Sequence, residues 1–225
     1  MALLQMNKLL LSLLTLWVVS VTTVSHAAEV KGSAVSGETK VSLCIGCHGI
    51  EGYQASFPEV HRVPKISGQN AKYLAASLLA YKNGDRKHPT MAGVATTLSE
   101  QDIADMAAFY GSHRVLGVVG SSAEPPQASA KVLELVEKGA CTSCHGEGFN
   151  KPLDGTYPKI SGQHADYLFV ALKSYKGEKR AVVGRNNAVM TGVVKQFSNA
   201  ELKVLADYIG KLPGDLKTIP QNRFR

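Results

Sequence analysis

All four cysteines of the chain lie in two copies of one five-residue pattern. Residues 44–48 read CIGCH, and residues 141–145, 97 positions further on, read CTSCH. Two cysteines three positions apart lie on one side of a helical turn, where they can form thioethers with the two vinyl groups of a haem while the following histidine binds the iron. The pattern predicts two covalently bound haem c groups. The residues that would hold them are Cys44, Cys47 and His48 in the first copy and Cys141, Cys144 and His145 in the second.

Zinc binding and disulfide formation are the alternative uses of four cysteines. A four-cysteine zinc site would have to take one pair from each copy. Disulfides would suit an exported protein. Neither alternative explains why a histidine follows each pair, whereas haem attachment uses every residue of the pattern.

The second axial ligand of a haem iron decides between electron transfer and substrate chemistry. The second half of the chain has a single methionine, Met190, which lies 45 residues after His145. In the first half, Met91 aligns with Met190 in the repeat described below, whereas Met106 lies in a helical pattern and is expected to pack in the core. We therefore predict Met91 and Met190 as axial ligands, with His88 as the rival ligand for the first haem. The other histidines, expected at the surface or in hydrogen bonds, are His61, His113 and His164.

Methionine ligation has a chemical consequence. A thioether favours reduced iron and raises the reduction potential relative to a second histidine. It also leaves no open coordination position for oxygen or peroxide. The predicted chemistry is the gain and loss of one electron at each haem, so we do not expect an enzyme.

The two motifs belong to a longer internal repeat. The segment PKISGQ occurs at residues 64–69 and again at 158–163, and the order of later landmarks is the same in both halves. Residues 117–127, GVVGSSAEPPQ, have no helical period. We predict a signal peptide over 1–27, an N-terminal cytochrome c domain over 28–116, a linker over 117–127 and a C-terminal cytochrome c domain over 128–225.

Each half is predicted to be all-α. Apolar residues recur at helical spacing after each PKISGQ segment, and residues 130–138 are rich in helix formers. Ser99 with Asp102 and Ser198 with Glu201 have the spacing of capping boxes. Residues 84–98 and 177–197 are expected to be long loops, which in a compact domain are usually functional or wrapped around a ligand.

The start of the chain is typical of a secretory signal peptide, with a short basic segment, an apolar run over 9–24 and small residues before a cut after Ala27. An uncleaved membrane anchor is the alternative, because the apolar run approaches spanning length. We expect export to the periplasm, where this type of haem attachment takes place. The formal net charge is +7, and residues 128–225 hold fifteen basic and nine acidic residues. Export argues against nucleic acid as the partner. The other partners that a basic surface favours are an anionic membrane, to which the protein would bind peripherally, and acidic proteins.

Together, CIGCH, CTSCH, the paired PKISGQ segments and the loops HPTMAGV and NAVMTGV resemble the dihaem cytochrome c4 family over nearly all of the chain without its leader. The resemblance implies two class I cytochrome c folds with haems close enough for internal electron transfer. It also implies a periplasmic carrier between a quinol-oxidising complex or dehydrogenase and a terminal oxidase. It further implies that the carbonyls of Pro64 and Pro158 accept the other ring N–H of His48 and His145; the alternative is that these prolines only shape local turns.

Two further questions concern partners and function. The side chains of Lys173, Lys176, Lys179, Arg180 and Arg185 could form a basic docking face or an ordinary solvated helix face. The alternative functions are a haem-bearing subunit of a respiratory or dehydrogenase complex and a dihaem peroxidase, which would need an open iron site.

Overall fold

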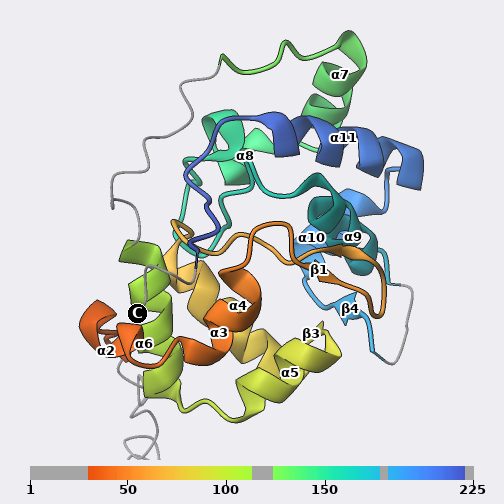
Figure 1. Cartoon of the computed structure of the whole chain (residues 1–225). Coiled ribbons are helices and arrows are strands. Elements are labelled where there is room, and N and C mark those ends of the chain that lie inside the picture. The colour runs from red at the N-terminus through yellow and green to blue at the C-terminus, as the bar shows by residue number, and fades with distance from the viewer. Residues whose placement is uncertain (1–29, 113–123, 178–181, 221–225) are drawn as a thin grey trace, which may run out of the picture.

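A computed structural model of the chain describes residues 30–112, 124–177 and 182–220. The predicted signal peptide, most of the linker and His113 lie outside these residues. Two groups of helices, one from each half of the sequence, lie one above the other in Figure 1. The expected all-α architecture of two tandem domains is confirmed, since the strands of the described residues are only two residues long.

The helices follow the same order in both halves, but a two-stranded hairpin follows the cysteine-motif helix in the first half and a 3-10 turn follows it in the second. The first domain contains α2 (Ala34–Glu38), α3 (Ser42–His48), β1 (Gln54–Ala55), β2 (His61–Arg62), α4 (Ala71–Asn83), β3 (Arg86–Lys87), α5 (Pro89–Thr96) and α6 (Glu100–Ser112). The second contains α7 (Ala130–Lys138), α8 (Thr142–His145), the 3-10 turn η1 (Glu147–Phe149), α9 (Ala165–Tyr175), β4 (Gly184–Arg185), α10 (Ala188–Val194) and α11 (Asn199–Lys211). Among the described residues, no helix combines the length and the apolar character that crossing a membrane requires.

Both predicted capping boxes are present. Ser99 and Asp102 exchange hydrogen bonds at the start of α6, each with an N–O distance of 3.1 Å. Ser198 and Glu201 do the same at the start of α11. These bonds satisfy backbone N–H groups that a helix start leaves without partners, so local side chains determine where both long C-terminal helices begin.

The prediction of long irregular loops over 84–98 and 177–197 was wrong in one respect. Each segment contains a short helix, α5 and α10, that carries the candidate methionine. Pro89 at the first turn of α5 is preset for a helix start, and the Asn187 side chain caps α10. Helices of this length are too short for a clear hydrophobic period and depend on tertiary packing.

The core of each domain forms where its last helix packs on the helix after PKISGQ. In the first domain α6 packs on α2 and α4, and in the second α11 packs on α9 and α7. The buried apolar side chains include Ile103, Met106 and Phe109 in the first and Leu202, Leu205 and Ile209 in the second. Met106 is therefore a core residue, as expected.

A nearly symmetric set of hydrogen bonds joins the two domains. The Gln69 side chain accepts from Lys159 N–H and donates to Lys159 C=O, both at 2.9 Å. The Gln163 side chain does the same with Lys65, at 2.9 and 2.8 Å. Both glutamines are buried. The repeated PKISGQ segments thus bind each other, and the final glutamine of each one supplies the contact.

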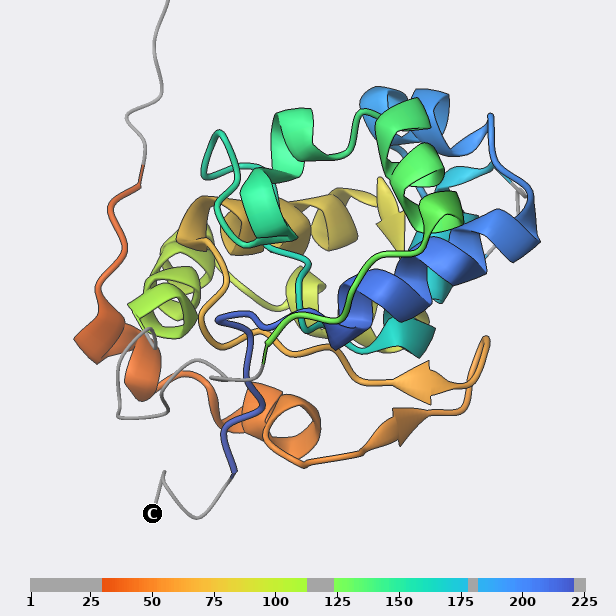
Figure 2. The same cartoon turned by 90° about the horizontal axis from the view of Figure 1, so that it is seen from above.

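Further contacts across the interface have no counterpart in the repeat. The hairpin of β1 and β2 extends from the first domain to α9 of the second, as Figures 1 and 2 show. Arg62 of the hairpin forms a salt bridge with Asp166, with 2.9 Å between Nε and Oδ2. The chain after α11 returns to the first domain, where Lys217 N–H donates to Ser67 C=O at 3.0 Å. Gly68 has a φ of 84° and no room for a Cβ beside Asp215, which explains why glycine stands there.

Candidate haem-binding sites

A cavity of about 760 Å³ extends through both domains. Its lining includes both cysteine motifs and both candidate methionines. Most of the other lining side chains are apolar, among them Ile66, Leu74, Leu168 and Leu172. A large apolar cofactor fits this lining, and it would supply the buried surface that domains of this size otherwise lack.

The cysteines are placed for attachment rather than for redox or zinc chemistry. None of the four forms a disulfide, and all of them line the cavity, on α3 and at α8. Burial raises the pKa of the Cys44 and Cys141 thiols, whereas a redox-active CxxC pair needs a lowered pKa. Among the described residues, no three His, Cys, Asp or Glu side chains are grouped so as to hold a metal ion.

Both motif histidines are held in one orientation by a proline carbonyl. His48 Nδ1 lies 2.8 Å from the carbonyl oxygen of Pro64, and His145 Nδ1 lies 2.9 Å from that of Pro158. A carbonyl only accepts, so each Nδ1 carries the hydrogen and each Nε2 keeps its lone pair. Burial lowers the pKa of both imidazoles, which keeps them neutral at pH 7. A neutral ring with a free Nε2 is the form that binds iron.

The candidate methionines occupy matching places in the two domains. Met91 lies in the first turn of α5 and Met190 in α10, and both are partly buried on the cavity lining. The backbone N–H of Met190 donates to Asn187 Oδ1 at 2.9 Å. Each domain therefore presents one free imidazole nitrogen and one thioether to the same cavity.

The remaining histidines have different surroundings. His88 lines the cavity close to Met91 in sequence, and its buried Nδ1 has no hydrogen-bond partner. His61 is buried and its Nδ1 lies 2.8 Å from Glu59 C=O, so it is a hydrogen-bonding residue, as expected. His164 precedes α9; burial, with Lys65 and Arg62 nearby, lowers its pKa to about 4.

Buried polar atoms without partners test whether a haem suits the cavity. Arg86 Nε and His88 Nδ1 are such atoms, and both residues line the cavity. A haem is apolar over its ring and carries carboxylates at one edge, so it offers both the apolar contact and the acceptors that this lining lacks. When bound, its iron supplies one-electron oxidation and reduction.

The basic docking face expected on the second domain is not supported by the described residues. Lys173 forms an ion pair with Glu59 of the first domain. Lys176 Nζ donates to Phe197 C=O at 2.8 Å, and Arg185 lines the cavity. Lys173 and Arg185 therefore contact the first domain, and Lys176 bonds within the second domain. Lys179 and Arg180 lie outside the described residues.

Sequence reasoning missed several cavity residues that recur in the repeat. Tyr73, Tyr81 and Arg86 of the first half correspond to Tyr167, Tyr175 and Arg185 of the second, and all six line the cavity. Their offsets of 94, 94 and 99 equal those of PKISGQ and of the candidate methionines. A search of the repeat for matched polar residues, beyond the cysteine motifs, would have found them.

Comparison with known proteins assigns the family. The cytochrome c family model matches residues 30–113 and again 129–213. Cytochrome c4 of Stutzerimonas stutzeri is 35% identical over 91% of this chain and 98% of its own. The thiosulfate dehydrogenase electron acceptor of Thiomonas intermedia is 28% identical over 77% of this chain and 80% of its own. The crystal structure of reduced cytochrome c4 from Pseudomonas stutzeri superposes with a TM-score of 0.57 and 29% identity, covering 80% of this chain and 99% of that one. The chain therefore belongs to the dihaem cytochrome c4 family, as a c-type electron carrier with two covalently bound haem c groups.

Proposed function

We propose that this chain is exported to the periplasm and carries electrons from a quinol-oxidising complex or a dehydrogenase to a terminal oxidase. His48 with Met91, and His145 with Met190, are the axial ligand pairs, and Pro64 and Pro158 orient the histidines. The observation that carries the proposal is the pairing, in each domain, of a free histidine Nε2 with a methionine on one cavity. Two closed coordination spheres leave electron transfer as the chemistry.

The proposed route is tested with membranes that contain the quinol-oxidising complex and the oxidase but lack soluble cytochromes. Added wild-type holoprotein is expected to restore quinol-dependent oxygen consumption. The Met190→Ala variant is expected to restore it poorly, because one of the two potentials changes. No restoration by a wild-type protein with two bound haems would contradict the proposed route.

A dehydrogenase as the donor is the candidate that a specific observation favours, since one relative is described as a thiosulfate dehydrogenase electron acceptor. Rapid reduction of the oxidised protein by such a dehydrogenase, in the absence of quinol, would support it. A chain that remains bound to a larger complex during purification would instead act as a haem-bearing subunit. Peroxide turnover by the wild-type protein, with a high-spin ferric spectrum, would support a peroxidase.

A further inference from the structure

The chain after α11 covers the two PKISGQ segments one after the other. Residues 212–214 lie on the second copy, where the carbonyl oxygen of Leu212 would be 3.1 Å from a Cβ at Gly162. Residues 215–219, called here the C-terminal segment, lie on the first copy. Figure 2 shows this blue chain leaving α11 and passing beside the orange helix α3 of the first domain.

The C-terminal segment contacts the backbone of the first domain at two places. Lys217 N–H donates to Ser67 C=O at 3.0 Å, within the first PKISGQ segment. The backbone of Ile219 lies against Gly49, where a Cβ would be 3.0 Å from the Ile219 carbonyl oxygen. Gly49 directly follows His48 and ends α3. The C-terminal segment therefore touches the end of the helix that carries the first motif histidine.

The second domain fixes the start of the C-terminal segment. Asp215 Oδ2 lies 2.7 Å from Lys159 Nζ, and Asp215 N–H donates to Asn150 Oδ1 at 3.1 Å. Leu216 is only 1% exposed. The C-terminal segment is therefore held by an ion pair, a hydrogen bond and apolar burial before it reaches the first domain.

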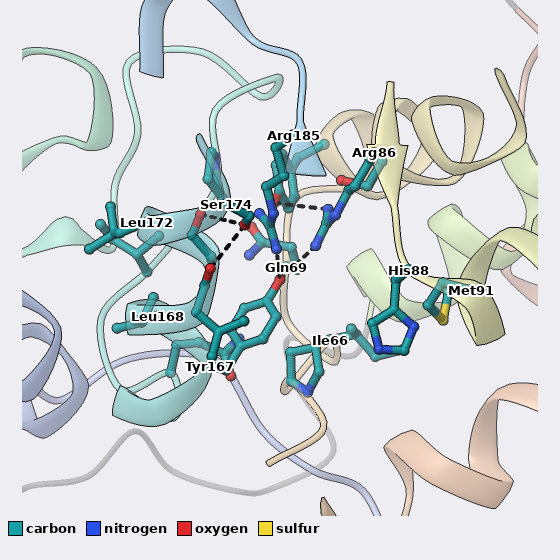
Figure 3. A pocket seen from close by; sticks show the side chains of 18 of the residues that line it. Ile66, Gln69, Arg86, His88, Met91, Tyr167, Leu168, Leu172, Ser174 and Arg185 are labelled. Atoms are coloured by element: carbon teal, nitrogen blue, oxygen red, sulfur yellow. Dashed lines mark hydrogen bonds between the residues drawn. The ribbon is translucent and has the colours of Figure 1, made fainter. Parts of the chain in front are cut away.

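The first PKISGQ segment lies between the cavity and the C-terminal segment. Pro64, Ile66 and Gln69 of this segment line the cavity, and Figure 3 shows Ile66 and Gln69 there. The Pro64 carbonyl oxygen is the acceptor 2.8 Å from His48 Nδ1. A shift of the PKISGQ segment would therefore move the group that orients His48.

We propose that the C-terminal segment positions His48 for the first haem iron, by holding both the Pro64 carbonyl and the end of α3 in place. It acts through these groups, since none of its own residues lines the cavity. This inference rests on the ligation of the first haem by His48 in the function proposed above.

The proposed support is specific to one haem. His145 does not depend on the C-terminal segment, because residues 212–214 cover the second PKISGQ segment. The second match to the cytochrome c family model ends at residue 213, so the C-terminal segment lies outside the matched fold.

The test compares reduced holoproteins whose chains end at Gly214 and at Pro220. The first lacks the C-terminal segment, and the second keeps it and is the matched control. NMR measures how fast the Nδ1–H protons of His48 and His145 exchange with solvent. The chain that ends at Gly214 should exchange the His48 proton about tenfold faster, because the bond to Ser67 is lost, with the His145 proton unchanged. The chain that ends at Pro220 should match the wild type at both histidines.

A redox titration of the same proteins gives a second readout. Water that reaches the His48 side of the first haem stabilises the ferric charge, so the first reduction potential should fall in the chain that ends at Gly214. The second potential should stay at its wild-type value.

A single substitution carries the test if the shortened chain does not accumulate. Lys217→Pro removes the N–H that donates to Ser67, whereas Lys217→Ala keeps it and is the control. Lys217→Pro should speed exchange at His48 alone, and Lys217→Ala should leave both histidines unchanged.

Two outcomes would overturn the positioning role. One is unchanged exchange at His48 without the C-terminal segment, and the other is equal acceleration at His48 and His145, which would indicate a general loss of stability. A wild-type protein whose first haem is not bound by His48 would contradict the proposed function itself. Wild-type ligation of both haems, with His48 exchange that ignores the C-terminal segment, would contradict this inference alone.

Discussion

The two domains hold their motif histidines in the same way but differ in how the methionine-bearing helix begins. In the second domain Asn187 caps α10 and binds the N–H of Met190 itself. In the first domain the corresponding residue is His88, which makes no capping bond to α5 and has a buried Nδ1 without a partner. A duplicated scaffold can thus keep the place of the candidate methionine while the start of the helix that carries it differs between the two copies.

The two domains also differ in the length of chain between the motif histidine and the proline whose carbonyl it contacts. His48 is 16 residues before Pro64, whereas His145 is 13 residues before Pro158. The longer connection contains the β1–β2 hairpin, and this hairpin supplies Arg62 to the interface. The two copies therefore differ at one of the places where they contact each other, which makes the duplicated chain an asymmetric two-domain protein.

Removing either methionine should give the largest effect. Met91→Ala and Met190→Ala are each expected to halve the far-red sulfur-to-iron absorbance of the oxidised protein and to open one iron site. The affected potential should fall by roughly 100 mV or more, within the ~0.8 V that axial ligands span. Full retention of the far-red band in Met91→Ala would favour a different ligand in the first domain, and His88→Ala then provides the comparison.

Breaking the symmetric interface should give the next largest effect. Gln163→Ala leaves the partly buried N–H and C=O of Lys65 without these partners, at a cost of about 2 kcal/mol in the free energy of unfolding. Gln69→Ala is the matched change in the other domain and should cost a similar amount. Denaturant unfolding measures both, and a cost below about 1 kcal/mol for either would contradict the assigned role.

Because α10 begins with a side-chain cap and α5 does not, substitution of the residue before each helix should affect the two helices unequally. Asn187→Ala should destabilise the α10 region by about 1 kcal/mol, because the cap to Met190 is lost. His88→Ala removes no cap from α5 and should spare the corresponding helix. Displacement of methionine by added imidazole, followed in the far-red band, compares the two variants, and equal effects would contradict the proposed difference between the two helix starts.

The smallest effect should appear in the stability of the protein at acidic pH. A hydrogen bond from Lys40, followed by bonds with Ser99, lowers the pKa of Asp102 to about 2. Since this value lies below the ordinary ~3.9 of an unfolded Asp, the stabilisation is present above about pH 4 and is lost as pH falls towards 2. In the Asp102→Asn variant, the free energy of unfolding should therefore fall less between about pH 4 and pH 2 than it does in the wild type. A loss of stability between about pH 4 and pH 2 that is as steep in Asp102→Asn as in the wild type would contradict this role of the Lys40 contact.

Local signals in the sequence predicted much of the fold. The helix over 130–138 and both capping boxes depend on residues a few positions apart, and all are present. The cysteine motifs predicted the cofactor for the same reason. Arg185 was expected on a surface and lies in the cavity, and the reciprocal glutamine contacts were not foreseen. These features arise only when residues about 90 to 100 positions apart meet, which no local pattern encodes.

The central claim is that each iron is closed by one histidine and one methionine. A redox titration of the wild-type holoprotein, followed by visible absorbance, tests it most directly. We expect two one-electron steps per chain, with low-spin spectra and the far-red sulfur-to-iron band from both haems when oxidised. A bis-histidine or five-coordinate spectrum for either haem would contradict it.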